Sequence, residues 1–386
     1  MRGHCREIKM TNREKFINYV KHGGKEFICS PQIGAGAGFD TKLAGKTWMT
    51  QTTVQDTINA TKMFDMVPLY NFGIPALSTL TDEFKEEHTV TISHEGKRRT
   101  TDTTFSCKKG TLHSRMIDEE MKGCCPVEFF VKDEDDLDIL EYFLDALLEV
   151  KDFSKISESI KRDRLIIGND EIMDVQWCTQ PYELLGFPST MDTAILAMEA
   201  EEQFMRIMDK ILKLDEKLIP AAAKGGTDFI FLGGPGSEMI SPAYYEKFLV
   251  PYSKIVTEMA HKNNLLVYSH ICSPIEPMLT KGYYNQMGID LFETLSPYPV
   301  GNVKSIEDAF SKLSPEICTR GNIGLDSLLK ESPEQIYEKA WHILEMAHKM
   351  GRKHMVAASD YMFYDTKVEN VHAMCKATRD FNEQNK

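Results

Sequence analysis

The segment from residue 228 to residue 272 decides the fold. It contains, in order, the apolar run Asp228-Phe-Ile-Phe-Leu232, the turn Gly233-Gly-Pro-Gly236, a helical pattern opened by Ser241-Pro242, and the apolar run Leu265-Leu-Val-Tyr-Ser269. Serine caps helix N-termini, proline fits the first helical position, and the apolar residues that follow recur with a helical period. A strand, a helix and a second strand in this order predict one unit of a parallel sheet.

Similar units recur along the 386 residues. We expect further strands at 26–30, 67–72, 165–168, 290–293, 316–319 and 353–357, and helices at 54–64, 192–214 and 332–350. A count close to eight favours a closed (β/α)8 TIM barrel over an open sheet. With a helix at 10–24 before the first strand, another at 54–64 after it, and no linker, the sequence predicts a single α/β domain with N-terminal helices spanning residues 1–386.

Residues 87–116 interrupt this repeat. His88–His94 and Arg99–Phe105 have strand character and flank Glu95-Gly96, which is a hairpin signal, and a third strand is expected at 111–116. We therefore expect a small antiparallel flap inserted between two barrel units.

Composition excludes several partners. The formal net charge of −13 disfavours nucleic acid and anionic membranes, and no apolar stretch approaches the roughly 20 residues needed to span a bilayer. The N-terminal segment is charged and lacks an apolar signal region, so a cytoplasmic protein is expected. Nine cysteines without a CxxC pair are consistent with reduced thiols.

The second apolar run ends in His270-Ile271-Cys272. Residues two apart on an extended chain face the same side, so an imidazole nitrogen and a thiol sulfur can converge at the mouth of a buried strand. Both are preferred zinc ligands, and zinc makes a bound thiol a thiolate at neutral pH. The alternative is that the two are separate structural residues.

Other polar residues follow predicted strands, where barrel enzymes place their chemistry. Glu293 and Asp360 offer further metal ligands, and the strands carrying His270 and Glu293 are expected to be neighbours. Glu238 is a candidate acid or substrate-orienting group, although it could simply cap the nearby helix. Asn322 could orient a ligand or only hold its turn.

Four blocks occur in the order Ser241-Pro-Ala-Tyr-Tyr-Glu-Lys-Phe-Leu-Val-Pro-Tyr252, His270-Ile-Cys272, Gly321-Asn-Ile323 and Val368-Glu-Asn-Val371. Together they resemble the uroporphyrinogen decarboxylase superfamily. The resemblance implies a (β/α)8 barrel, and the superfamily contains both tetrapyrrole decarboxylases and zinc methyltransferases that work with corrinoid proteins.

The resemblance favours the methyltransferase branch. The decarboxylases carry substrate-binding arginines just after the first strand, whereas residues 32–38 here contain none. The methyltransferases carry His-x-Cys, matched by His270 and Cys272, and a later cysteine whose position falls on Asp360. An oxygen ligand in place of a second thiolate would make zinc more electrophilic, which suits activation of a methyl donor such as an ether oxygen.

The sequence thus predicts a zinc-dependent methyltransferase that moves a methyl group between a small methylated substrate (a methoxylated aromatic or a methylamine) or a thiol and the cobalt of a corrinoid protein partner. His270, Cys272, Asp360 and Glu293 would hold zinc, and Glu238 and Asn322 would orient the substrate. A homo-oligomer is compatible with the sequence. The alternatives are a metal-free decarboxylase or lyase on the same barrel and a non-catalytic corrinoid-binding protein.

Overall fold

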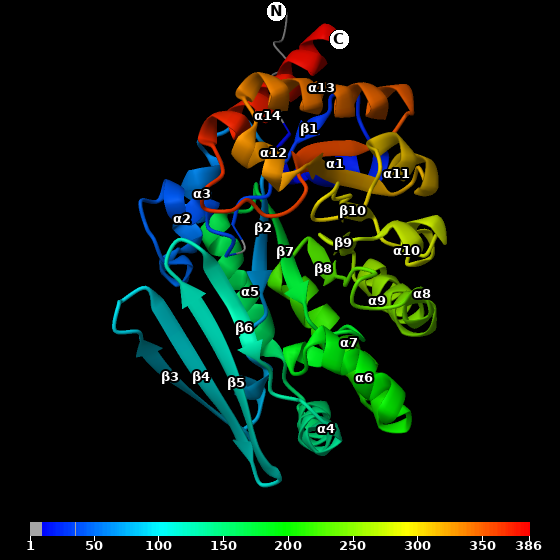
Figure 1. The fold of residues 1–386 in the computed structure, drawn as a ribbon. Coiled ribbons are helices and arrows are strands. Elements are labelled where there is room, and N and C mark those ends of the chain that lie inside the picture. Colours follow the sequence, from blue (N-terminus) through cyan, green and yellow to red (C-terminus); the bar gives the residue numbers. More distant parts are fainter. Residues whose placement is uncertain (1–9, 35) are drawn as a thin grey trace, which may run out of the picture.

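The computed structural model describes residues 10–34 and 36–386, and the charged segment 1–9 lies outside them. Eight strands, all parallel, follow the order β1-β12-β11-β10-β9-β8-β7-β2, with helices outside the sheet (Figure 1). The predicted α/β TIM-barrel fold with N-terminal helices is confirmed. Within the described residues, no helix combines the length and apolar character needed to cross a membrane.

The barrel strands are β1 (Ile28–Cys29), β2 (Leu69–Gly73), β7 (Ile172–Trp177), β8 (Phe229–Gly233), β9 (Leu266–His270), β10 (Leu291–Thr294), β11 (Cys318–Ile323) and β12 (His354–Ala358). The helices are α1 (Asn12–His22), α2 (Phe39–Leu43), α3 (Val54–Thr61), α4 (Glu134–Glu149), α5 (Ser154–Ile167), α6 (Thr190–Glu199), α7 (Glu201–Gly225), α8 (Pro242–Tyr244), α9 (Val250–Lys262), α10 (Glu276–Thr280), α11 (Ile306–Lys312), α12 (Leu325–Lys330), α13 (Pro333–Lys349) and α14 (Val368–Gln384). A π-helical segment, Tyr245–Leu249, joins α8 to α9.

The two end strands of this sheet, β1 and β2, are consecutive along the chain. The amide of Val67, just before β2, donates a hydrogen bond to the carbonyl of Cys29 in β1 at 2.9 Å. This bond brings the ends of the sheet together, so the ring closes between its first two strands.

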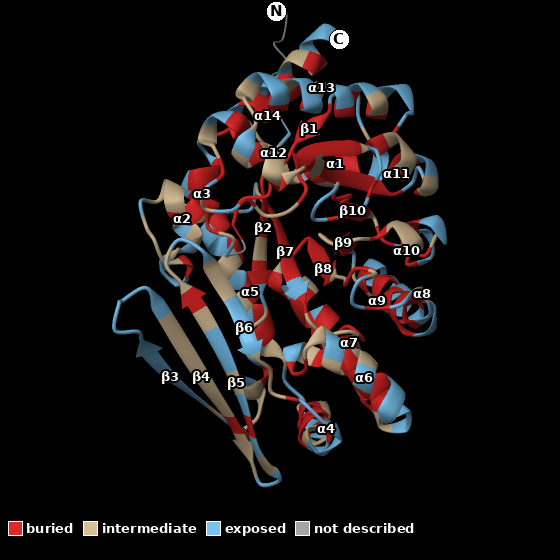
Figure 2. Ribbon diagram, in the orientation of Figure 1, coloured by how far each residue is buried: buried red, intermediate tan, exposed pale blue. Residues whose placement is uncertain are grey.

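The antiparallel insertion is confirmed and is larger than expected. It has four strands in the order β3 (Lys85–Ile92), β4 (Arg98–Cys107), β5 (Gly110–Glu119) and β6 (Gly123–Glu128). Sequence patterning missed β6 because Pro126 lies inside it, and proline argues against a strand unless the strand is at an edge. The flap strands are largely exposed or half-buried, whereas the barrel strands are buried (Figure 2).

The strand predicted at 165–168 is wrong. These residues form the last turn of α5, which ends at Gly168 with a φ of 90°, and Leu165 is 80% exposed. The apolar run resembled a strand because a glycine ends it, but a glycine is equally the usual stop of a helix. The barrel strand at this point of the chain is β7, which begins at Ile172.

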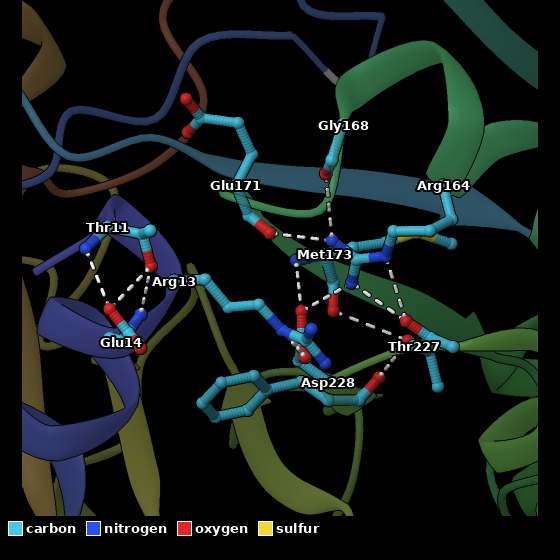
Figure 3. A network of polar contacts seen from close by, with 11 residues as sticks. Thr11, Arg13, Glu14, Arg164, Gly168, Glu171, Met173, Thr227 and Asp228 are labelled. Carbon is cyan, nitrogen blue, oxygen red and sulfur yellow. Dashed lines mark hydrogen bonds and ion pairs between the residues drawn. The ribbon is translucent and has the colours of Figure 1, made fainter.

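The amino end of the barrel is closed by α1 and by a charged network (Figure 3). Phe16 of α1 packs edge-on against Phe229 at 5.8 Å between ring centroids. Asp228, just before β8, accepts from Arg13 at 2.7 Å and from Arg164 at 2.5 Å, and its second oxygen also accepts the Met173 amide at 3.0 Å. Both oxygens of this buried carboxylate therefore have partners, and the network links α1 and α5 to two strands.

Candidate metal centre at the barrel mouth

His270 is the last residue of β9 and lies at the carboxyl end of the barrel. Its register partners are Gly233 in β8 and Glu293 in β10, so the strands carrying His270 and Glu293 are indeed neighbours. The His270 side chain is buried, and Cys272 follows two residues later in a half-buried position. The apolar run of β9 thus delivers both predicted ligands to the mouth.

Asp360, two residues beyond the end of β12, meets them there. One ligand atom from each of His270, Cys272 and Asp360 lies within 4.8 Å of the other two. Nε2 of His270 is 3.3 Å from Oδ1 of Asp360, and that oxygen also accepts the backbone N–H of Tyr361 at 2.7 Å. A nitrogen, a sulfur and an oxygen converging on one point are a donor set that zinc accepts.

Glu293 lies on the other side of the imidazole. Its Oε1 is 2.8 Å from Nδ1 of His270, and its Oε2 accepts from Nη1 of Arg320 at 2.8 Å. Arg320, fully buried in β11, also donates from Nε to the carbonyl of Ser30 at 2.8 Å. A carboxylate bound to the second nitrogen of a metal-binding histidine fixes the orientation of the ring. In this geometry Glu293 contacts His270 from outside the three-residue cluster.

The charges around His270 favour a positive charge at this point. Burial lowers the pKa of His270, but its contacts with Asp360, Cys272 and Glu293 outweigh burial and raise that pKa well above its usual range. Burial raises the pKa of Glu293, yet the Arg320 charge and the His270 hydrogen bond leave it below its ordinary value. The mouth is therefore suited to hold a cation.

The other two predicted residues are not members of the three-residue cluster. Asn322 is inside β11 and does not follow it, donates to the carbonyl of Leu295 at 3.0 Å, and lines a separate cavity of about 690 Å³ together with Ser359. Glu238 is exposed in the loop after β8. Glu238 and Ser273 both reach the point that a β-carbon on Gly236 would occupy, which places Glu238 beside the loop that carries Cys272.

A second cavity connects the flap to the cluster. It has a volume of about 550 Å³ and is lined on the barrel side by Asp360, Tyr361 and Phe363, and on the flap side by Ile117 and Cys124, among others. The flap therefore covers one approach to the candidate metal ligand Asp360, which gives a small molecule a partly enclosed place beside it.

Arg320 is a site residue that sequence reasoning missed. The segment Arg320-Gly-Asn-Ile-Gly324 drew attention to Asn322 because Asn322 was expected to follow its strand. An arginine within an apolar strand is itself a signal, since a buried arginine needs an acidic or carbonyl partner inside the barrel.

A parallel barrel with these donors at its carboxyl end has the general layout of a barrel enzyme. The sequence matches the Uroporphyrinogen decarboxylase (URO-D) family over residues 184–381, just over half of the chain, and the protein belongs to this family. The matched segment contains His270, Cys272, Glu293 and Asp360. No curated protein matches the chain.

Two solved structures are similar to the chain to different degrees. A methyltransferase from Methanosarcina mazei is 14% identical, with a TM-score of 0.66 over 97% of this chain and 99% of that chain. A B12-independent methionine synthase from Shewanella sp. W3-18-1, in complex with selenomethionine, is 12% identical, with a TM-score of 0.38 over 59% of this chain and 65% of that chain. At such identities the first likeness describes the shared barrel.

Proposed function

We propose that the protein is a zinc-dependent methyltransferase that exchanges a methyl group between a small methylated substrate and the cobalt of a corrinoid protein. The observation that carries this proposal is the convergence of His270, Cys272 and Asp360 within 4.8 Å at the barrel mouth. Membership of the URO-D family and the barrel shared with a protein described as a methyltransferase support the same reading.

The donor set fits zinc in number and kind. Three protein ligands leave a fourth position for a substrate atom, which is the arrangement of catalytic zinc sites. When bound there, zinc acts as a Lewis acid on the heteroatom that carries or receives the methyl group. The Asp360 carboxylate in place of a second thiolate favours a methylated oxygen or nitrogen substrate over a thiol.

The surrounding residues prepare this site. Glu293, held by Arg320, orients the imidazole so that Nε2 faces Cys272 and Asp360. The cavity beneath the flap accommodates the substrate next to Asp360. The exposed carboxylate of Glu238, on the adjacent loop, orients the substrate from the rim.

Metal content and methyl transfer test the proposal together. Purified protein should contain about one zinc per chain by elemental analysis, and Cys272→Ser should lose most of it. Cys107→Ser, a half-buried flap cysteine, is the matched control and should keep the metal. With free cob(I)alamin and a panel of methoxylated phenols and methylamines, wild type should form methylcobalamin, followed by absorbance, and Cys272→Ser should not.

Two results would contradict this function. One is a protein without zinc that methylates cob(I)alamin as fast as the zinc-loaded protein. The other is release of CO2 from acidic aromatic or pyrrolic substrates, unaffected by Cys272→Ser, which would instead identify a metal-free decarboxylase.

A further inference from the structure

The loop that follows β7 brings two titratable side chains to the barrel mouth. Gly233, the last residue of β8, is the register partner of His270. A β-carbon on Gly233 would collide with the hydroxyl of Tyr182, and it would lie 3.9 Å from Nε2 of Gln180. The loop therefore fills the space that the missing side chain of Gly233 leaves open.

That space lies on the same face as His270. Alternate residues of a strand face the same side, so a side chain at 233 would share the face of Phe231. The ring of Phe231 lies 5.7 Å from the ring of His270. In-register neighbours of adjacent strands also share a face. The Tyr182 hydroxyl is thus placed on the inner side of the barrel, one strand away from His270.

Helices on the outside of the barrel hold this loop in place. Tyr244 of α8 donates to the carbonyl of Pro181 at 2.7 Å, and Tyr252 of α9 bonds the Thr179 hydroxyl at 2.5 Å. Tyr252 in turn donates to the buried Asp215 at 2.7 Å. With Thr179 and Pro181 anchored just before it, Tyr182 is held in one arrangement, as a preorganised catalytic group requires.

Gln180 organises the polar atoms at the tip of the loop. Its Nε2 is 3.4 Å from the Tyr182 oxygen and 3.4 Å from Oε1 of Glu183. The amide is a donor to both oxygens, and Tyr182 and Glu183 also share a hydrogen bond, so the two hydroxyl groups are linked.

Burial keeps the Glu183 carboxyl protonated at neutral pH. Burial raises the pKa of the Glu183 carboxyl to about 8, against the lowering effect of its contacts with Gln180 and Tyr182. The titratable groups facing the Tyr182–Glu183 pair are Cys178 on the loop and Tyr245 and Tyr252 on the helices packed against it, and burial raises the pKa of each. All are neutral near pH 7, so the pair presents proton donors without net charge.

We propose that Tyr182, supplied by Glu183, donates a proton to the heteroatom that loses its methyl group, and that the substrate is a methyl ether. This inference rests on the proposed methyltransferase function and names its substrate class. Tyr182 and Glu183 precede the segment that matches the URO-D family, which begins at residue 184.

The step balances without a further reagent. The methyl group would pass to the electron pair of cob(I)alamin as the carbon–oxygen bond breaks, and the ether oxygen would keep the bonding pair. That oxygen takes the Tyr182 proton and leaves as an alcohol or phenol. Glu183 returns a proton to Tyr182 and is itself reprotonated from solvent.

The Tyr182–Glu183 pair distinguishes methyl ethers from methylamines, the two substrate classes that the metal site alone allows. An ether oxygen has lone pairs that accept an O–H donor. A methylamine is cationic at neutral pH and has no lone pair to accept this bond. The pair therefore favours the ether.

Binding and turnover of 2-methoxyphenol test the assignment. By calorimetry, wild type and the control Tyr337→Phe, a distant tyrosine on α13, should bind the probe, and Tyr182→Phe should bind it about 5-fold more weakly. In the cob(I)alamin assay, kcat of Tyr182→Phe should fall about 100-fold with zinc content unchanged. Glu183→Gln should remove the loss of wild-type activity as the pH rises through about 8.

A nitro-substituted methoxyphenol separates proton donation from packing. Its leaving phenolate needs little protonation, so the Tyr182→Phe defect should shrink at least about tenfold on this probe. An equal defect on both probes, full activity of Tyr182→Phe, or no binding of 2-methoxyphenol by wild type overturns the proposal. If wild type lacks zinc and transfers no methyl group, the methyltransferase function fails, and the calorimetry still decides whether Tyr182 binds the ether.

Discussion

The two ends of the barrel each hold a charged cluster, and the clusters differ in how their groups are satisfied. At the amino end, Asp228 is surrounded by Arg13, Arg164 and a backbone amide, and each of its oxygens has a partner. At the mouth, His270, Cys272 and Asp360 converge with a surplus of acceptors beside a cavity. The first arrangement joins elements of the fold, whereas the second is suited to receive something the chain does not contain.

The largest loss of stability is expected from removing Asp228 at the amino end. Asp228→Ala leaves Arg164 buried without its anion, and breaking a buried pair in this way costs about 3–5 kcal/mol. We expect urea denaturation to show this loss, with zinc content unchanged. Asp209→Ala, an exposed carboxylate on α7, is the control and should unfold like wild type. A destabilisation below 1 kcal/mol would remove the structural role assigned to the amino-end cluster.

Asp360→Ala should weaken metal binding and leave stability nearly unchanged, the opposite of Asp228→Ala. Asp360 is half-buried and follows its strand, so its loss should leave the unfolding free energy close to that of wild type. Metal affinity should fall more than about 100-fold, since even partners outside the ligand shell are worth 10–100-fold. Competition with a chromogenic chelator measures this affinity. Unchanged affinity would exclude Asp360 as a ligand.

Glu293→Gln tests a residue that contacts both the proposed metal-binding histidine and a buried arginine, and so bears on metal affinity and on stability. The amide retains an oxygen for His270 but leaves the buried Arg320 charge uncompensated. We expect metal affinity to weaken about 10–100-fold, together with a measurable loss of stability. Loss of stability with unchanged metal affinity would place Glu293 with the structural cluster and not with the mouth.

The smallest effect is expected at Arg13. Its side chain is 38% exposed, so its bond to Asp228 is partly screened by solvent. Arg13→Ala should lower the unfolding free energy by about 1 kcal/mol or less, well below the effect of removing Asp228. A loss as large as that of Asp228→Ala would show that α1 depends on this ion pair.

The strand that leads to the site was predictable from sequence because its apolar run ends in a pair of possible metal ligands. Leu265–Ser269 led directly to His270 and Cys272, and the order of the chain placed Glu293 on the neighbouring strand. The convergence of Asp360 with them depends on ring closure from the far end of the chain, which spacing alone does not fix. The resemblance to the uroporphyrinogen decarboxylase superfamily is what identified Asp360 as a candidate ligand.

The error at 165–168 had a further cost. A strand placed seven residues too early hides the loop 178–183 at the mouth, and with it Tyr182 and Glu183. Arg320 was missed for a different reason. Its partner Glu293 lies 27 residues away, and only the register of β10 and β11 brings the two together.

The short first strand affects where the barrel opens locally. β1 has only two residues, and the Val67–Cys29 hydrogen bond joins it to β2, whereas β8 and β9 pair over five positions. Local opening begins where the fewest bonds must break. Hydrogen exchange should therefore be faster at the Val67 amide than in β9. Gly36 and Ala37, in the loop after β1, line the cavity beside Asp360, so local opening at this seam would change the cavity next to the candidate metal centre.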